Sequence, residues 1–468
     1  MELIEDAREW CNEQFASADF GNLLRARRAG SMLRRILERP AGRVTEVFDD
    51  DAEQQAAYNF VEGETPVEAI VEALAQATLR QIADDPFVYV PLDGTSLTLT
   101  DRLKSKGFGS VGRRQFPTRG LKVIDAIAVR PDGTPMGLLG LEWWARSPRT
   151  STSRARRRRR GETEVRHWVG AIEHVDTLFA ESTCKPWFVI DAEGDAADIL
   201  RALTASTRHF TVRVSQRDRF VIRGNQRLKL GQFMRRRRRC GTREVLIPKA
   251  PGRRARIARL EIRSARLQLE IPVNETGGRM TISVGVVWAT ERHAPFGEKK
   301  IDWMLLTDQF VDTLELSSIV LDGYCHRWRI EDFHRSWKSG ACNVEDTQLR
   351  AMDHVLRWAT LLAAVATRIE QLKHLARTRP ETLASEVFSD IEIRALIAYK
   401  RSRKKRTETI PDTVPTIGTA VLWLAQLGGY TGKSSGGPPG SITIGRGLQR
   451  HAIWADAFGV SEKLHRKT

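Results

Sequence analysis

The chain has few cysteines, and no stretch of it reads as a signal peptide or a membrane span. Only five of its 468 residues are cysteine, and none of these forms a Cys-x-x-Cys pair. This usage argues against a zinc site and favours a reducing cytoplasm. The acidic start Met1–Asp6 is unlike a signal peptide, and the apolar run Trp358–Ala366 is too short to cross a bilayer. We therefore expect a cytoplasmic protein with no membrane partner.

Acidic residues are scarce relative to basic ones. The sequence has 58 Asp and Glu against 75 Lys and Arg, which gives a formal net charge of +17. Such an excess favours a polyanionic partner, because each phosphate that a protein neutralises releases condensed counterions. Nucleic acid is the first candidate, and an anionic membrane surface is the second. The sequence also lacks a glycine-rich phosphate loop, so we expect a reaction that does not use ATP.

One stretch, Tyr324–Lys338, combines an apolar stripe with a line of polar side chains. Four polar residues stand 0, 3, 7 and 14 positions from its start: Tyr324, Arg327, Glu331 and Lys338. On a single α-helix these offsets share one stripe, and three apolar residues fall on the opposite side: Ile330, Phe333 and Trp337. An acid held among cations suits a metal ion beside phosphates. Taken alone, the pattern also fits an amphipathic helix with solvated ion pairs.

This stretch resembles a known family. The spacing Tyr-x2-Arg-x3-Glu-x6-Lys matches the tyrosine–arginine–glutamate–lysine motif of DDE transposases in the insertion-sequence-4 family. Further matches follow in family order along nearly the whole chain: Trp10, Tyr58–Phe60, Asp93–Leu97, Glu142–Trp144, Asp191–Asp195, Trp303–Thr307 and Leu427–Tyr430. The sequence is most similar to the hairpin-forming, cut-and-paste members of that family.

The resemblance implies a catalytic triad of Asp93, Asp191 and Glu331 on a ribonuclease-H-like α/β core. The residues themselves agree in part, because two predicted hydrophobic strands, Phe87–Asp93 and Trp187–Asp191, each end on an acid. In the family plan, the first and fourth strands are neighbours and bring the two aspartates together. Three other acids lie close enough along the chain to be mistaken for the second acid: Glu193, Asp195 and Asp198. Ala192 replaces an arginine of the family, which puts local phosphate contacts in question.

Three carboxylates gathered at one point require a cation, because like charges raise each other's pKa. Mg²⁺ suits such hard oxygen ligands, and we expect Mn²⁺ to substitute for it. Two ions about 3.5–4 Å apart would serve an in-line displacement at phosphorus. Water as nucleophile gives nicking, whereas a DNA 3′-hydroxyl gives hairpin closure or strand transfer. The expected substrates are double-stranded transposon ends with inverted repeats, and target DNA.

The resemblance also implies DNA contacts around the site. Trp303 takes the position of the tryptophan that holds a flipped base in the family, and Trp328 is placed to support it. Arg327 and Lys338 would bind the phosphates around the flipped nucleotide, and Tyr324 would hydrogen-bond one of them. Core packing is the ordinary alternative for Trp303, which starts an apolar strand.

Three domains are predicted. Residues 1–70 form a helical domain that binds the transposon end, with an arginine-rich helix over 22–38 whose candidate DNA contacts are Arg27, Arg28 and Arg35. Residues 71–380 form the catalytic domain, with a β-rich insert at about 215–305. Residues 381–468 form a helical domain that pairs two protomers in the synaptic complex, although sequence alone also allows a packing cap. Residues 344–377 are predicted as one long helix, and 154–160 as a basic loop.

The combined prediction is a dimeric, Mg²⁺-dependent, cut-and-paste DNA transposase associated with the bacterial nucleoid. A non-catalytic DNA-binding regulator derived from a transposase is the rival from another class. The three acids and both cations at family spacing argue against that rival. A generic ribonuclease-H-like nuclease is a third possibility, which specific paired cutting at inverted ends would exclude. His326 and His334 need no catalytic role, and we expect them to serve the structure.

Overall fold

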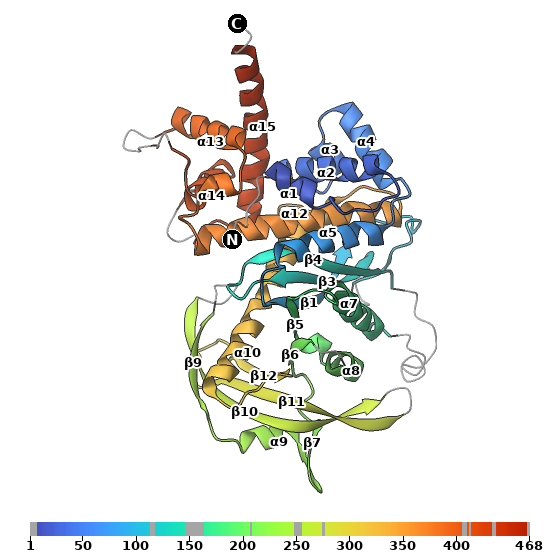
Figure 1. Cartoon of the computed structure of the whole chain (residues 1–468), viewed down its shortest axis with the longest axis vertical. Coiled ribbons are helices and arrows are strands. Elements are labelled where there is room, and N and C mark those ends of the chain that lie inside the picture. Colours follow the sequence, from blue (N-terminus) through green and yellow to red (C-terminus); the bar gives the residue numbers. More distant parts are fainter. Residues whose placement is uncertain are drawn as a thin grey trace. The chain divides into compact units, whose positions relative to one another are not determined.

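The structure, a computed structural model, divides the chain into two compact units (Figure 1). Unit 1 comprises Met1–Asp84, Gly94–Pro148 and Arg329–Thr468, and unit 2 comprises Asp85–Asp93 and Arg149–Trp328. The structure describes residues 7–112, 118–146, 163–205, 208–247, 255–273, 277–404, 410, 413–432 and 437–465. The basic loop predicted at 154–160 lies outside the described residues.

A mixed β-sheet forms the frame of unit 2. The first part of β1 (Phe87–Thr98) pairs in parallel with β5 (Lys185–Ile190), which pairs in parallel with β6 (His209–Arg213). β5 is almost entirely apolar and buried, as expected for a parallel strand covered on both faces. The predicted adjacency of the two acid-bearing strands is therefore confirmed.

The chain between β6 and β12 (Asp302–Thr307) extends the same sheet. Beyond β12 the strand order is β11-β10-β7-β8, and β9 pairs with β10. The elements of this part are β7 (Phe220–Arg223), β8 (Gln226–Lys229), α9 (Leu230–Arg235), β9 (Gly241–Ile247), β10 (Arg256–Val273) and β11 (Gly278–Glu291). The period-two alternation in the sequence follows one buried face, since Leu267, Leu269 and Ile271 of β10 are buried.

Unit 2 also contains helices around this sheet. They are α7 (Val165–Leu178), the short η1 (Ala192–Gly194), α8 (Ala197–Ala205) and α10 (Leu314–His326).

Unit 1 is organised around the 27-residue helix α12 (Met352–Thr378). It packs on β4 (Pro135–Trp144) and on α5 (Val67–Gln81), as Figure 1 shows, and β4 pairs with β3 (Arg119–Val129), next to the short β2 (Gly109–Ser110). α12 is buried on nearly all sides, and its buried Arg357 donates to the carbonyl oxygens of Thr65 at 2.6 Å and Val61 at 2.8 Å.

The prediction of one helix over residues 344–377 is wrong at its start. Residues Val344–Asp346 form a separate 3₁₀ turn (η2), and α12 begins only at Met352. Thr347 and Ala351 have extended ψ values of 142° and 151°, so the helix cannot run through this segment.

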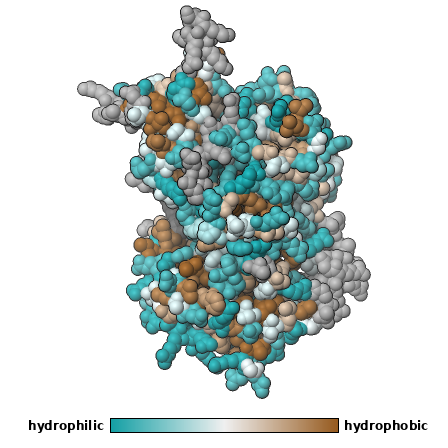
Figure 2. Space-filling view, in the orientation of Figure 1, coloured by the Kyte–Doolittle hydropathy of each residue, from teal (hydrophilic) through white to brown (hydrophobic). Residues whose placement is uncertain are grey.

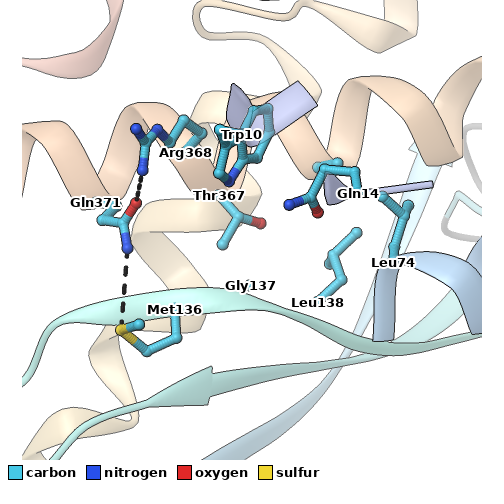
Figure 3. Close-up of a pocket in the computed structure, with 10 residues that line it drawn as sticks. Trp10, Gln14, Leu74, Met136, Gly137, Leu138, Thr367, Arg368 and Gln371 are labelled. Carbon is cyan, nitrogen blue, oxygen red and sulfur yellow. Dashed lines mark hydrogen bonds between the residues drawn. The ribbon is translucent and has the colours of Figure 1, made fainter. Parts of the chain in front are cut away.

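A small cavity lies between α12, β4 and Trp10 (Figure 3). Its volume of about 10 Å³ is hardly enough for one water molecule. Gln371 bridges its rim, accepting from Arg368 at 2.6 Å and donating to the sulfur of Met136 at 3.9 Å. The cavity is a packing defect in the core and is too small for a substrate.

The described parts nearest both ends of the chain are helical and belong to unit 1. The N-terminal part holds α1 (Ala7–Glu13), α2 (Leu23–Glu38), α3 (Val44–Val47) and α4 (Asp51–Val61). The predicted start of the arginine-rich helix is confirmed, since the Asn22 side chain caps α2 by accepting from Leu24 N–H at 2.7 Å.

The C-terminal part contains α13 (Asp390–Ser402), α14 (Ile417–Leu427) and α15 (Ser441–His465), besides the short η3 (Ala384–Glu386). No helix of the described chain is long and apolar enough to cross a membrane. The face shown in Figure 2 is mostly hydrophilic, with hydrophobic residues in separate groups.

Candidate active site

Two of the three predicted catalytic acids lie on neighbouring strands of unit 2. Leu92 of β1 is in register with Ile190 of β5. Asp93 and Asp191 are the next residues, so they lie at the same carboxyl edge of this parallel pair, and both are half-buried. Asp191 also starts the η1 turn, because its Oδ1 accepts the Glu193 N–H at 2.7 Å.

Asp195, one of the acids that could be mistaken for the second acid, is a structural group. Its side chain is fully buried and its Oδ2 accepts the backbone N–H groups of Ser215 at 2.6 Å and Gln216 at 2.9 Å. Its other oxygen binds the buried guanidinium of Arg219, which also donates to the Asp195 carbonyl at 2.9 Å. These contacts occupy the carboxylate and leave Asp191 as the better candidate for catalysis.

The stretch Tyr324–Lys338 is not one uninterrupted helix, and that prediction is corrected. α10 ends at His326 and α11 (Trp328–Lys338) begins at Trp328. Arg327 between them keeps near-helical dihedrals, but its N–H donates to the Tyr324 carbonyl three residues back, at 3.2 Å. This tightened turn is of the 3₁₀ kind and changes the angular spacing on which the single stripe depended.

Arg327 is a buried cation beside the first acid. Its Nη1 lies 3.5 Å from Oδ2 of Asp93, and the two side chains are only 7% and 14% exposed. Its guanidinium also lies 5.9 Å from the centroid of the Tyr324 ring and 5.5 Å from that of Trp328. Trp328 is 38% exposed, so this cluster reaches the surface of unit 2 through an indole ring.

Tyr324 and Trp303 pack against each other beside that arginine. Their rings meet edge to face at 5.4 Å, and both side chains are buried. Burial raises the pKa of Tyr324, although Arg327 and Arg213 oppose the shift, so the phenol stays protonated at neutral pH. This burial is compatible with core packing of Trp303.

Arg213 is a member of the site that the sequence reading missed. It ends β6, is in register with Leu305 of β12, and hydrogen-bonds the Tyr324 side chain. In the sequence, Arg213 is recognisable only as a cation at the end of the strand that follows Asp191. The order of the strands in the folded sheet is what brings Arg213 beside Tyr324.

Glu331 and Lys338 stand two turns apart on the part of α11 that belongs to unit 1. The predicted buried face is confirmed, since Ile330, Phe333 and Trp337 are fully buried. The Trp337 indole N–H donates to the Ala359 carbonyl of α12 at 3.0 Å, which fixes α11 on the core helix. Lys338 Nζ lies 3.3 Å from the Thr95 hydroxyl and 3.8 Å from a carboxylate oxygen of Glu345.

Histidines near the motif serve the structure, as expected. His334 on α11 contacts the fully buried Asp125 of β3, with 2.6 Å between Nε2 and Oδ1. Burial raises the pKa of the Asp125 carboxyl, and His334 acts in the opposite direction. His326 packs against the ring of Tyr89 in unit 2 at 5.5 Å.

The predicted DNA contacts on α2 differ in their surroundings. Arg27 and Arg28 are exposed. Arg35 is instead held by carboxylates: its guanidinium lies 3.0 Å from Glu53 and 3.2 Å from Glu38. Burial disfavours the charge of Arg35, but these hydrogen bonds outweigh it and raise its pKa. Arg35 therefore ties α2 to α4 and is a poor candidate for a phosphate contact.

Within the described parts of the chain, no group of three or more His, Cys, Asp or Glu side chains is arranged to hold a metal ion. Asp93 and Asp191 offer a pair of carboxylates in unit 2, and Glu331 belongs to unit 1. The donor chemistry fits a hard divalent cation, because carboxylate oxygens are the ligands that such ions prefer.

Three protein-family models match the chain, and together they support a DNA transposase. They are Transposase DNA-binding over residues 7–65, Transposase DDE domain over 169–368, and Transposase Tn5 dimerisation domain over 364–463. The first and last support DNA binding and homodimer formation. The DDE domain implies a ribonuclease-H-like core and a general dependence on divalent metal. Its match contains Asp191 and Glu331 but begins after Asp93.

Proposed function

We propose that the protein is a cut-and-paste transposase of the insertion-sequence-4 family, in the tyrosine–arginine–glutamate–lysine subgroup. It binds inverted terminal repeats, nicks the transposon ends, excises through a DNA hairpin and joins the ends to target DNA. The observation that carries this proposal is the register of β1 and β5, which sets two family-matched aspartates at one sheet edge. The order of the three matched transposase models supports it independently.

Asp93, Asp191 and Glu331 would hold Mg²⁺, with Mn²⁺ as a substitute. When bound, two such ions supply Lewis-acid polarisation of the phosphate and activation of the attacking hydroxyl. Arg327 balances the negative charge of Asp93 and orients its carboxylate through the contact at 3.5 Å. Asp191 is oriented by the Glu193 N–H, which binds one of its two carboxylate oxygens.

The cations of the motif would position the DNA phosphates. Tyr324 would donate a hydrogen bond to a phosphate as a neutral phenol, because burial keeps its proton in place. Arg327 presents a planar guanidinium suited to bidentate phosphate contacts, and Lys338 supplies a point charge. Arg213 extends this group, since it already bonds Tyr324.

Trp303 and Trp328 would stabilise the distorted end during hairpin closure. A 3′-hydroxyl must reach the opposite strand, and removing one base from the stack relieves that geometry at a cost of a few kcal/mol. Stacking of the base on an aromatic ring offsets this cost. Trp328 is partly exposed and available for such a contact, whereas Trp303 must first part from Tyr324.

End recognition and pairing would use the two helical parts of unit 1. The proposed domains are 1–70 for the transposon end, 71–380 for catalysis and 381–468 for pairing of protomers. Arg27 and Arg28 are the proposed phosphate contacts on α2, because both are exposed. We propose that cutting occurs only within the paired complex.

The test is to separate DNA binding from cutting. The genomic DNA flanking the gene supplies the terminal repeats, which are built into a labelled duplex. Asp93→Asn, Asp191→Asn and Glu331→Gln should bind this duplex with nearly wild-type affinity and fail to nick it in Mg²⁺. Arg27→Gln with Arg28→Gln should weaken binding and leave the metal site intact. A triad variant that cuts at the wild-type rate would remove that residue from the proposed site.

A further inference from the structure

The loop between β11 and β12 carries a fully exposed phenyl ring. The accessible surface of Phe296 is 107% of that of a reference phenylalanine residue. Single exposed apolar residues are common on protein surfaces and need no explanation by themselves. Phe296 differs because the backbone beneath it is held by defined contacts.

The ring sits at the corner of a closed turn. The Glu298 N–H donates to the Pro295 carbonyl at 3.1 Å, which places Phe296 and Gly297 at the two central positions. Gly297 has φ of +80°, the left-handed value that a type II turn requires at its third residue. Glycine adopts this φ without strain, so the sequence specifies the turn that projects Phe296.

A buried ion-pair cluster fastens this turn to the sheet. Arg256 of β10 donates from Nε to Glu298 at 2.8 Å and from Nη2 to Glu291 at 3.0 Å. Glu291, at the end of β11, also accepts the Ile301 N–H at 3.0 Å. The Arg256 and Glu291 side chains are 12% and 2% exposed, so water screens this cluster little.

The outward groups of the loop are cationic. Its one carboxylate, Glu298, is bound by Arg256, whereas three basic residues beside the turn are exposed: Arg292, Lys299 and Lys300. Arg292 lies 3.7 Å from Glu261 but keeps 66% of its side chain exposed. An apolar ring flanked by exposed cations complements a stacked base step flanked by phosphates.

We propose that Phe296 is a wedge that enters a base step of duplex DNA, while Arg292, Lys299 and Lys300 bind the neighbouring phosphates. The inference rests on the proposed function only in that the protein binds DNA. The contact is separate from Trp303 and Trp328, because it uses a preformed turn on the outside of unit 2. Since the turn is already ordered, little conformational entropy is lost on insertion. The expected consequence is a local kink in the duplex.

The probe is a mixed-sequence duplex labelled at both ends, so that anisotropy reports binding and energy transfer reports bending. Phe296→Ala should bind roughly tenfold more weakly and lose most of the bend, because an aromatic contact with a base is removed. Phe296→Leu should retain most of the bend, since leucine also serves as a wedge. Leu246→Ala is the matched control: it removes a 72% exposed apolar side chain on β9 of the same unit.

Salt dependence separates the wedge from the cations. Phe296→Ala should leave the slope of log affinity against log salt concentration unchanged. The double variant Lys299→Gln/Lys300→Gln should reduce the size of this slope by roughly 2. Benzoylphenylalanine at position 296 should crosslink to the duplex. Wild-type binding and bending by Phe296→Ala, or a crosslink to a second copy of the chain, would overturn the inference. No DNA binding by the wild type would instead overturn the proposed function, and with it the wedge.

Discussion

Asp191 and Asp195 stand four positions apart, and the structure gives them opposite responses to the same substitution. Asp195→Asn keeps the shape of a fully buried side chain but removes the charge that balances the buried Arg219. Breaking such a pair by removing one partner costs about 3–5 kcal/mol. The amide oxygen of the asparagine can still accept hydrogen bonds from the Ser215 and Gln216 N–H groups. We therefore expect the free energy of unfolding to fall by about 3 kcal/mol, the lower end of that range. For a cooperative unit of this size, the Tm would fall by roughly 6–12 °C.

Asp191→Asn should behave differently. Asp191 is half-buried, and the amide oxygen can keep its one hydrogen bond from Glu193, so the Tm should change little. Cutting should nevertheless be lost. Thermal unfolding and Mg²⁺-dependent nicking of the terminal-repeat duplex, measured on both variants below the lower Tm, test this contrast. Asp195→Asn with Arg219→Met should recover part of the lost stability, because an apolar replacement of a buried pair is often tolerated. Loss of cutting by a stable Asp195→Asn protein, with cutting kept by Asp191→Asn, would reverse the two assignments.

Three further outcomes are expected. The Trp303→Ala protein should nick the first strand normally but close hairpins slowly. An abasic site at the flipped position of the DNA should partly restore the rate of hairpin closure. Equal slowing of both steps would indicate that Trp303 is a core residue. Affinity for the end duplex should fall by roughly 10³–10⁵ between 50 and 200 mM salt if ~6–10 phosphates are contacted, and a flat response would contradict the charge argument. Partial burial raises the pKa of the Asp302 carboxyl, but hydrogen bonds from Arg217 and Trp288 outweigh it and leave the pKa below its usual 3.8. The stabilisation that the charged Asp302 provides is present above about pH 4 and is lost as the pH falls through the lowered pKa. The Tm difference between wild type and Asp302→Asn should therefore shrink on acidification. A Tm difference that stays constant with pH would exclude the Asp302 charge as its cause.

The sequence predicts the sheet edge of the site well, because its signals are local. Apolar runs before Asp93 and Asp191 identify two buried strands that pair as expected, but the first strand does not end at Asp93, because β1 continues to Thr98. Asn22 and Thr416 mark helix starts by the side-chain caps that they form. The start of α13 carries a comparable local signal, because Ser389 and Glu392 form a capping box.

Features that depend on distant parts of the chain were not predictable. The role of Arg213 depends on a strand and a helix that meet only in the folded unit. The burial of Asp195 depends on Arg219, a residue 24 positions away. Arg35 likewise pairs with Glu53 on another helix. The number of arginines on the predicted helix therefore could not distinguish Arg35 from the exposed Arg27 and Arg28.

Metal preference tests the central claim most directly. Replacing a coordinating carboxylate by cysteine exchanges a hard ligand for a soft one, which disfavours Mg²⁺ more than Mn²⁺. We predict that Asp93→Cys, Asp191→Cys and Glu331→Cys bind the terminal-repeat duplex, fail to nick it in Mg²⁺ and regain measurable nicking in Mn²⁺. Asp195→Cys should show no such change in preference. Equal inactivity of a triad variant in both metals with DNA binding intact, or equal activity in both, would contradict metal ligation by that residue.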